Sequence, residues 1–126
     1  MTAVFQGLPS RVVFGKGALA SLAEEAEALG CRRLLVVCTG SQRAAAERAM
    51  GILGGAGAVL FPGAAMHTPV EVTQQAMKLV GEAGIDGVVA IGGGSAIGLS
   101  KAIALRTDLP QIVAPSTYAG VISEPA

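Results

Sequence analysis

Apolar residues recur along this chain in two alternating patterns. Short runs in which nearly every position is apolar include Leu34–Cys38 and Gly87–Ile91, and such continuity indicates strands that are buried on both faces of a parallel sheet. Between these runs lie longer segments in which apolar residues return at helical spacing. The alternation predicts an α/β fold, a Rossmann-like parallel sheet with helices on both faces.

The predicted strands and helices are bounded by glycine, proline and polar residues. Strands are predicted over 34–38, 58–61, 87–91 and 111–114, and helices over 18–29, 41–53, 68–82 and from the glycine turn at 92–95 to about 105. Near the start, Val4–Phe5 and Arg11–Phe14 flank a Gly-Leu-Pro-Ser turn, which predicts a small N-terminal β-hairpin. For the third helix, Thr68 is the expected cap and Pro69 the first helical residue.

Composition narrows the function classes. The chain has 126 residues, which allows one domain or one incomplete piece of a larger protein, and 52% hydrophobic residues exclude a disordered chain. Nine Lys and Arg balance nine Asp and Glu, and aromatic residues make up 3%, so we expect no nucleic-acid partner. The longest uncharged run, 49–70, is broken by glycines and prolines, and no secretion signal is recognisable, so we expect no membrane partner and a cytoplasmic location.

The two cysteines, Cys31 and Cys38, are neither a close pair nor accompanied by a cluster of histidines. A disulfide or a metal role is the alternative, but the spacing favours small apolar filler residues in a reducing cytoplasm.

The strongest chemical signal is a glycine turn between a predicted strand and a predicted helix, Gly92-Gly93-Gly94-Ser95. Glycines let backbone N–H groups approach an anion with no Cβ in the way, and the following helix directs its positive end at the same point. Ser95 is placed either to cap that helix or to bond a phosphate oxygen. The turn predicts a pyrophosphate site; a plain tight turn between strand and helix is the alternative.

Ligands of an open parallel sheet bind beyond the carboxyl ends of its strands. Three predicted strand ends meet there: Thr39-Gly40-Ser41, the glycine turn, and Ser116-Thr117, all small or hydroxylic as a pyrophosphate site requires. The glycines at 92, 94 and 98 do not match the common dinucleotide fingerprint G-x-G-x-x-G.

The remaining candidates each have a plainer alternative. His67, the single histidine, could line the cofactor cleft, although a structural place in its loop is favoured. Lys101 could face the site or the solvent, and Arg43 could meet a 2′-phosphate, although a solvated helix position is favoured. Glu47 and Arg48 fit an ordinary exposed helix face.

No acid–base or metal set emerges from the spacing. Neither Asp86 nor Asp108 falls at the carboxyl end of a predicted strand, and one histidine cannot serve several roles. No metal-ligand spacing exists, so no metal site is predicted and the catalytic residues stay unassigned.

Three segments follow one another in a familiar order: Arg11–Gly17 (RVVFGKG), Gly92–Ala102 (GGGSAIGLSKA) and Pro115–Gly120 (PSTYAG). Together they resemble the iron-containing alcohol dehydrogenase superfamily, over residues 5–120. Within it the chain is most similar to the maleylacetate reductases, because Gly98 stands where the wider superfamily usually has Asp and Tyr118 is typical of these reductases.

The resemblance implies NADH or NADPH as the cofactor. It implies contacts to the cofactor at these positions: pyrophosphate at Gly93, Gly94 and Ser95, and the nicotinamide side at Ser116 and Thr117. Thr39 stands where NAD-preferring relatives often have Asp for the adenosine ribose. Without that carboxylate there is no repulsion against a 2′-phosphate, so NADPH is expected to be tolerated as well as NADH.

The implied activity is hydride transfer from NAD(P)H to the carbon–carbon double bond of maleylacetate, a small dicarboxylate, giving 3-oxoadipate in aromatic-compound degradation. Full-length members form homodimers and carry a second, all-helical domain that supplies metal ligands in metal-dependent members and much of the substrate pocket. The chain ends at Ala126, so residues 1–126 are expected to be a truncated N-terminal NAD(P)-binding domain without those ligands. The alternatives are a catalytically inactive nucleotide-binding module, or another iron-type alcohol or glycerol dehydrogenase, against which Gly98 and Tyr118 count.

Overall fold

The computed structural model describes residues 10–12, 22–66 and 69–114. Strands and helices alternate along this part of the chain, with two short 3-10 turns, η1 and η2, around the second helix. The elements are β1 Ser10–Val12, α1 Leu22–Ala28, β2 Leu34–Val37, η1 Gly40–Gln42, α2 Arg43–Leu53, η2 Gly54–Ala56, β3 Gly57–Phe61, α3 Val70–Ala83, β4 Gly87–Ile91, α4 Gly94–Thr107 and β5 Gln111–Ala114.

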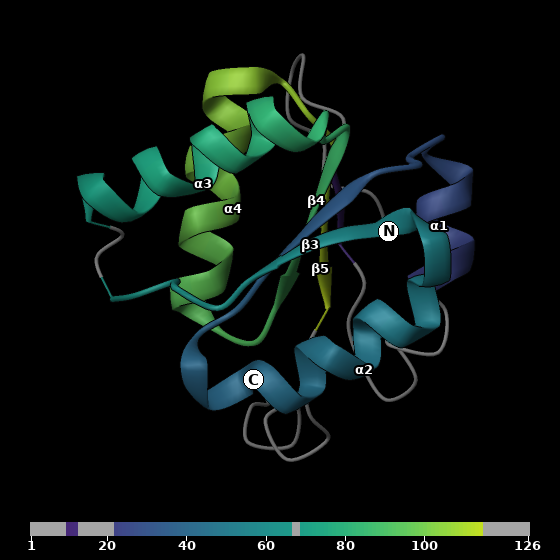
Figure 1. The fold of residues 1–126 in the computed structure, drawn as a ribbon, viewed down its shortest axis with the longest axis horizontal. Coiled ribbons are helices and arrows are strands. Elements are labelled where there is room, and N and C mark those ends of the chain that lie inside the picture. The colour runs from purple at the N-terminus through teal and green to yellow at the C-terminus, as the bar shows by residue number, and fades with distance from the viewer. Residues whose placement is uncertain (1–9, 13–21, 67–68, 115–126) are drawn as a thin grey trace.

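The five described strands form one sheet in the order β1-β5-β4-β2-β3, and every neighbouring pair is parallel (Figure 1). The predicted parallel sheet is therefore confirmed. The predicted N-terminal hairpin is tested only in its second half. Ser10–Val12 is a strand, but its partner in the described chain is β5, in parallel, whereas Val4–Phe5 lies outside the described residues.

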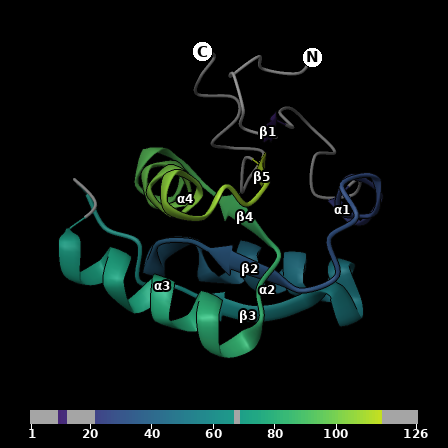
Figure 2. The same ribbon diagram turned by 90° about the horizontal axis from the view of Figure 1, so that it is seen from above.

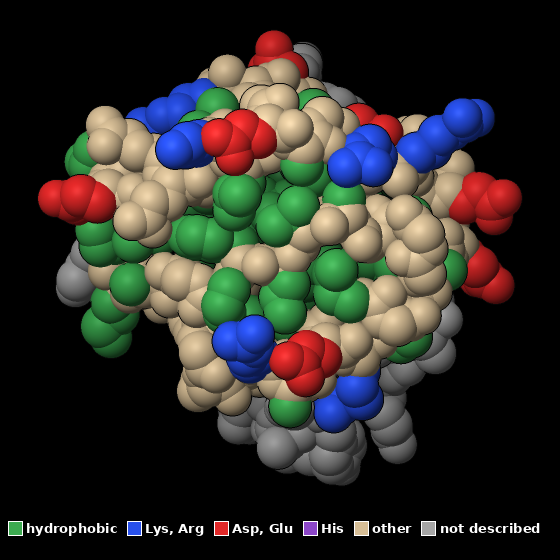
Figure 3. Space-filling view, in the orientation of Figure 1, with side chains coloured by type: hydrophobic (Ala, Val, Ile, Leu, Met, Phe, Trp, Pro, Cys, Tyr) green, Lys and Arg blue, Asp and Glu red, His purple; other side chains and the backbone are tan. Residues whose placement is uncertain are grey.

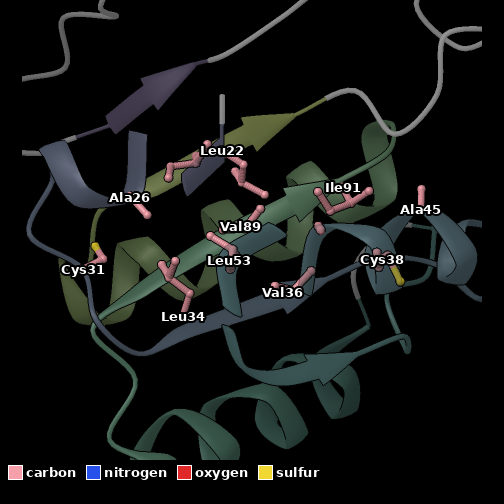
Figure 4. Close-up of a cluster of buried hydrophobic side chains, with 13 residues drawn as sticks. Leu22, Ala26, Cys31, Leu34, Val36, Cys38, Ala45, Leu53, Val89 and Ile91 are labelled. Atoms are coloured by element: carbon pink, nitrogen blue, oxygen red, sulfur yellow. The ribbon is translucent and has the colours of Figure 1, made fainter. Parts of the chain in front are cut away.

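The central strands are buried because helices cover both faces of the sheet. Each residue of β2 is fully buried, and all five residues of β4 are buried. One apolar cluster joins β2 and β4 to α1 and α2, and a second joins them to α3 and α4 on the other face (Figure 2). In Figure 4, Leu34 and Val36 from β2 lie beside Leu53 from α2 in the first cluster. Continuous apolar runs thus correspond to strands packed on both sides.

Asp86 ties together the amino ends of β2 and β4. Its carboxylate accepts hydrogen bonds from the backbone N–H groups of Arg32 and Arg33, both at 2.9 Å. The Asp86 N–H in turn donates to the backbone oxygen of Arg33 at 2.8 Å. This carboxylate therefore has a structural role at the edge of the sheet opposite the glycine turn.

β3 is one of the two outer strands of the described sheet, with β1 at the other side, and all five residues of β3 are partly exposed. Its register shifts against β2, since Leu34 pairs with Gly57 but Leu35 pairs with Val59, which leaves Ala58 as a bulge. Figure 3 shows hydrophobic side chains gathered over β3 between α3 and α2, with charged side chains around them. A bulge on an outer strand disfavours edge-to-edge pairing with another chain.

Two helix starts differ by a residue or two from those predicted. α3 begins at Val70, and Pro69 is its N-cap with extended ψ of 148°, not its first helical residue; Thr68, the predicted cap, lies outside the described residues. α2 begins at Arg43 after the η1 turn rather than at Ser41. The Pro69 carbonyl accepts hydrogen bonds from the N–H groups of Val72 and Thr73, both at 3.1 Å. The first turn of α3 is therefore formed by backbone hydrogen bonds, without a side-chain cap.

No helix in the described part of the chain is both long enough and apolar enough to cross a membrane.

Candidate functional site

The chain leaves β2 and β4 in opposite directions. These strands are neighbours, with Val37 beside Ala90. From β2 the chain passes through α2 to β3 on one side, and from β4 it passes through α4 to β5 on the other. The connections diverge at the carboxyl ends of the two strands, which is the switch point where open α/β sheets bind ligands. Thr39–Ser41 and Gly92–Ser95 lie on either side of it.

The glycine turn after β4 has one glycine that the fold itself requires. Gly92 has φ +120°, and a Cβ built on it would lie 3.3 Å from Cγ of Gln42. By contrast, a Cβ built on Gly93 or Gly94 would lie within 4 Å of no atom of the other described residues, apart from the neighbouring backbone. The described fold therefore accounts for Gly92, while the absence of side chains at Gly93 and Gly94 leaves open space above the backbone.

That open space lies at the start of α4. The Ile97 N–H donates to the Gly93 carbonyl at 3.1 Å, so the amides of the three preceding helical residues have no acceptor within the helix. Gly93 is the N-cap and has no side chain to satisfy them. Of the two roles predicted for Ser95, the helix cap is wrong, because Ser95 is already the second helical residue; the contact to a phosphate oxygen stays a prediction. The amides at this helix start are positioned for an anion.

The β2 side of the switch point carries two hydroxyl groups. Thr39 Oγ1 and Ser41 Oγ are 3.1 Å apart, and Thr39 is partly buried. Gln42 extends from this side across to Gly92. The structure thus brings two of the three predicted strand ends together. Ser116, Thr117, Tyr118 and His67 lie outside the described residues.

Comparisons with known proteins identify the family of this chain. The family model for iron-containing alcohol dehydrogenases matches residues 9–124. The chain belongs to this family. It is 53% identical over 117 residues to a maleylacetate reductase of Rhizobium sp. strain MTP-10005, covering 93% of this chain and 33% of that protein. A maleylacetate reductase of Burkholderia cepacia is 49% identical with the same coverage. The chain therefore spans about a third of the length of these curated relatives.

Solved structures of the family have the same fold. The maleylacetate reductase of Agrobacterium tumefaciens superposes with a TM-score of 0.80 at 50% identity, covering 94% of this chain and 34% of that one. A sulfoacetaldehyde reductase of Bifidobacterium kashiwanohense, solved in complex with NAD+, gives 0.73 at 25% identity, covering 93% and 36%. The resemblance predicted from the three motifs is confirmed at the level of family and fold.

The other candidate side chains are accounted for without a ligand. Arg43 Nε lies 3.2 Å from Glu47 Oε2 in an exposed pair within α2. Lys101 is exposed on α4. Asp108 ends α4 in the left-handed conformation with φ +61°. As predicted, Asp86 and Asp108 lie away from the carboxyl ends of the strands.

Within the described ranges, no group of three or more His, Cys, Asp or Glu side chains is placed to hold a metal ion. A surface hollow in this part of the chain lies elsewhere, at the amino end of β2 between the ends of α1 and α2. It is lined by Ala23, Ala26, Glu27, Gly30, Cys31, Arg32, Leu53 and Ala56. It is therefore at the opposite edge of the sheet from the glycine turn and is not part of the candidate site.

Both cysteines are buried free thiols. The pKa of the Cys38 thiol is raised, mainly because the thiol is buried. The charge of nearby Arg43 lowers this pKa, and the charge of Glu47 raises it. Burial also raises the pKa of Cys31, and the Asp86 carboxylate adds to that increase. The thiols are therefore protonated in the folded protein at neutral pH and are poor nucleophiles.

We expect both thiols to react with a maleimide at least about tenfold more slowly in the native chain than in urea. Because folding raises the pKa of both thiols, unfolding releases protons above about pH 8.5. Their contribution to stability is complete below that pH and falls as the pH rises. Urea unfolding between pH 7 and 10 measures this loss, which a variant with Ala at both positions should lack. Rapid labelling of the native chain would contradict the prediction.

Gln42 is the residue of this site that the sequence pattern did not single out. It follows a hydroxyl-rich strand end and carries no charge, so nothing in its spacing distinguishes it from a solvated helix start. Only the three-dimensional approach of η1 to the glycine turn after β4 brings it against Gly92.

Proposed function

We propose that residues 1–126 form the NAD(P)-binding domain of a maleylacetate reductase. The observation that carries this proposal is the open space over Gly93 and Gly94 at the uncapped start of α4. A diphosphate needs backbone N–H groups that it can approach closely, and a Cβ at either glycine would occupy that space. The identity to curated maleylacetate reductases supports the choice of reaction.

In this proposal, each strand end holds a different part of the dinucleotide. The backbone of Gly93 and Gly94, with Ser95, binds the diphosphate. Thr39 lies beside the adenosine ribose. Ser116 and Thr117, which follow β5 in the sequence, line the nicotinamide side.

A bound reduced nicotinamide would supply the hydride that, together with one proton, reduces the carbon–carbon double bond of maleylacetate to give 3-oxoadipate and the oxidised cofactor. The residues of this chain contribute by fixing the diphosphate, so that the nicotinamide is held at the carboxyl edge of the sheet. Free thiols and a nicotinamide reductant both fit the reducing cytoplasm as the location.

Binding and turnover can be tested separately on the same chain. NADH and NADPH are titrated by nicotinamide fluorescence, ADP-ribose by calorimetry, and maleylacetate-dependent loss of NADH is then followed. Saturable binding of all three ligands supports the proposed domain. Binding without turnover favours a nucleotide-binding module that does not catalyse the reaction by itself. If none of the three ligands binds, the proposed function is wrong.

Thr39 provides a test of the ribose contact. We expect Thr39→Asp to raise the Kd for NADPH at least about tenfold more than the Kd for NADH, because a carboxylate at the end of β2 accepts from ribose hydroxyls but repels a 2′-phosphate. Thr39→Val removes the hydroxyl without adding charge and should leave the ratio of the two dissociation constants unchanged. An equal effect of Thr39→Asp on both cofactors would exclude Thr39 from the ribose site.

A further inference from the structure

The side chain of Gln42 lies across the switch point. Gln42 is the last residue of η1, on the β2 side. Its Cγ lies 3.3 Å, and its Cβ 3.9 Å, from the place that a Cβ on Gly92 would take. The aliphatic part of Gln42 therefore lies against Gly92, where a Cβ would make a tight contact and where φ of +120° itself favours glycine. This packing holds the side chain at the first residue of the glycine turn.

The backbone N–H of Gln42 has a hydrogen-bond partner, whereas its side-chain amide has none among the described residues. The Gln42 N–H donates to the Thr39 carbonyl at 3.0 Å, which closes the η1 turn. The side chain is partly buried. Its amide makes no hydrogen bond to any other residue that the structure describes. A side chain that is held by its stem, and whose terminal donor has no partner among the described residues, is suited to contact a ligand.

We infer that the Gln42 side-chain amide donates a hydrogen bond to the diphosphate of the bound dinucleotide. This inference rests on the proposed function and adds a residue that positions the same ligand. The amide lies two bonds beyond a Cγ that is already seated on Gly92, whereas the ribose is assigned to Thr39, three residues earlier. The diphosphate thus lies between the amides at the start of α4 and a neutral donor from the opposite loop.

A neutral donor is the appropriate group at this place. Glutamine adds a hydrogen bond from its N–H to a phosphate oxygen without a charge of its own. A glutamate of nearly the same shape would have only acceptors and would repel the diphosphate. The contact involves a part that NADH, NADPH and ADP-ribose share, so it should affect all three in the same way.

Two variants test the inference. Gln42→Glu keeps the shape and replaces the donor by a carboxylate, and we expect the Kd values for NADH, NADPH and ADP-ribose all to rise at least about tenfold. Gln42→Met keeps an unbranched stem against Gly92 and removes the donor, and the three Kd values should rise by about three- to tenfold. Gln74→Glu, the same substitution on the exposed face of α3, is the matched control and should change none of them.

The ratio of the Kd for NADPH to the Kd for NADH distinguishes the outcomes. An equal rise in the Kd values for NADH and NADPH supports the contact to the diphosphate, provided that both variants unfold at the same temperature as the Gln74→Glu control. A changed NADH to NADPH ratio would move Gln42 to the ribose and overturn the inference, as would unchanged Kd values in both variants. A lowered unfolding temperature in Gln42→Met would assign Gln42 to the stability of the glycine turn instead. If the wild-type chain binds none of the ligands, it is the proposed function that fails.

Discussion

Replacing Gly94 with alanine should remove most of the affinity for NADH and NADPH while leaving the fold intact. The new Cβ would meet no other described residue within 4 Å outside its own helix, and Gly94 is the first residue of α4, where alanine favours the helix. The Cβ would, however, stand where a phosphate oxygen has to approach the amides. Loss of one hydrogen bond to a charged group corresponds to about a 10- to 100-fold rise in Kd. Fluorescence titration of both cofactors measures it.

Gly81→Ala is the matched control for this substitution. Gly81 lies on the exposed face of α3, and a Cβ there also meets nothing within 4 Å. We expect this variant to gain about 0.5–1 kcal/mol of stability and to bind both cofactors as the wild type does. If Gly94→Ala bound the cofactors as tightly as Gly81→Ala, the diphosphate would not lie over the start of α4.

The strands of this fold are readable from the sequence because their environment is simple. Gly87–Ile91 and Gln111–Ala114 are predicted and observed with the same bounds. A strand with helices on both faces needs apolar residues at successive positions, and the glycine or proline beside it marks its end. The position of the candidate site was predictable for a similar reason: the carboxyl ends of parallel strands lie at the same edge of the sheet, whatever the order of the strands.

The pairing of β1 and the details of the site depend on contacts that are distant in sequence. The turn residues before Ser10 predicted a hairpin from local chemistry, but the described partner of Ser10–Val12 is β5, almost at the other end of the described chain. The cap of α4 is Gly93 rather than Ser95, because the helix begins two residues earlier than the composition of the turn suggested. Gln42 gained its place only because η1 comes close to Gly92, the residue that follows β4.

The position of α4 is maintained by its buried face, so substitutions there should affect stability far more than substitutions on its exposed face. Leu99 is fully buried in the cluster between α4 and the sheet, whereas Leu105 on the same helix is 70% exposed. We expect Leu99→Ala to lower the free energy of unfolding by about 2–5 kcal/mol, and Leu105→Ala to change it by less than about 0.5 kcal/mol.

Urea unfolding of the two variants measures this difference. Both replace leucine by alanine in one helix, so the gain in helix propensity is the same and cancels in the comparison. The loss in Leu99→Ala then reports the packing that holds the start of α4 beside Gly92, and with it the amides that the dinucleotide uses. Equal destabilisation by the two variants would mean that α4 is not held by this cluster, and the geometry of the glycine turn would need another support.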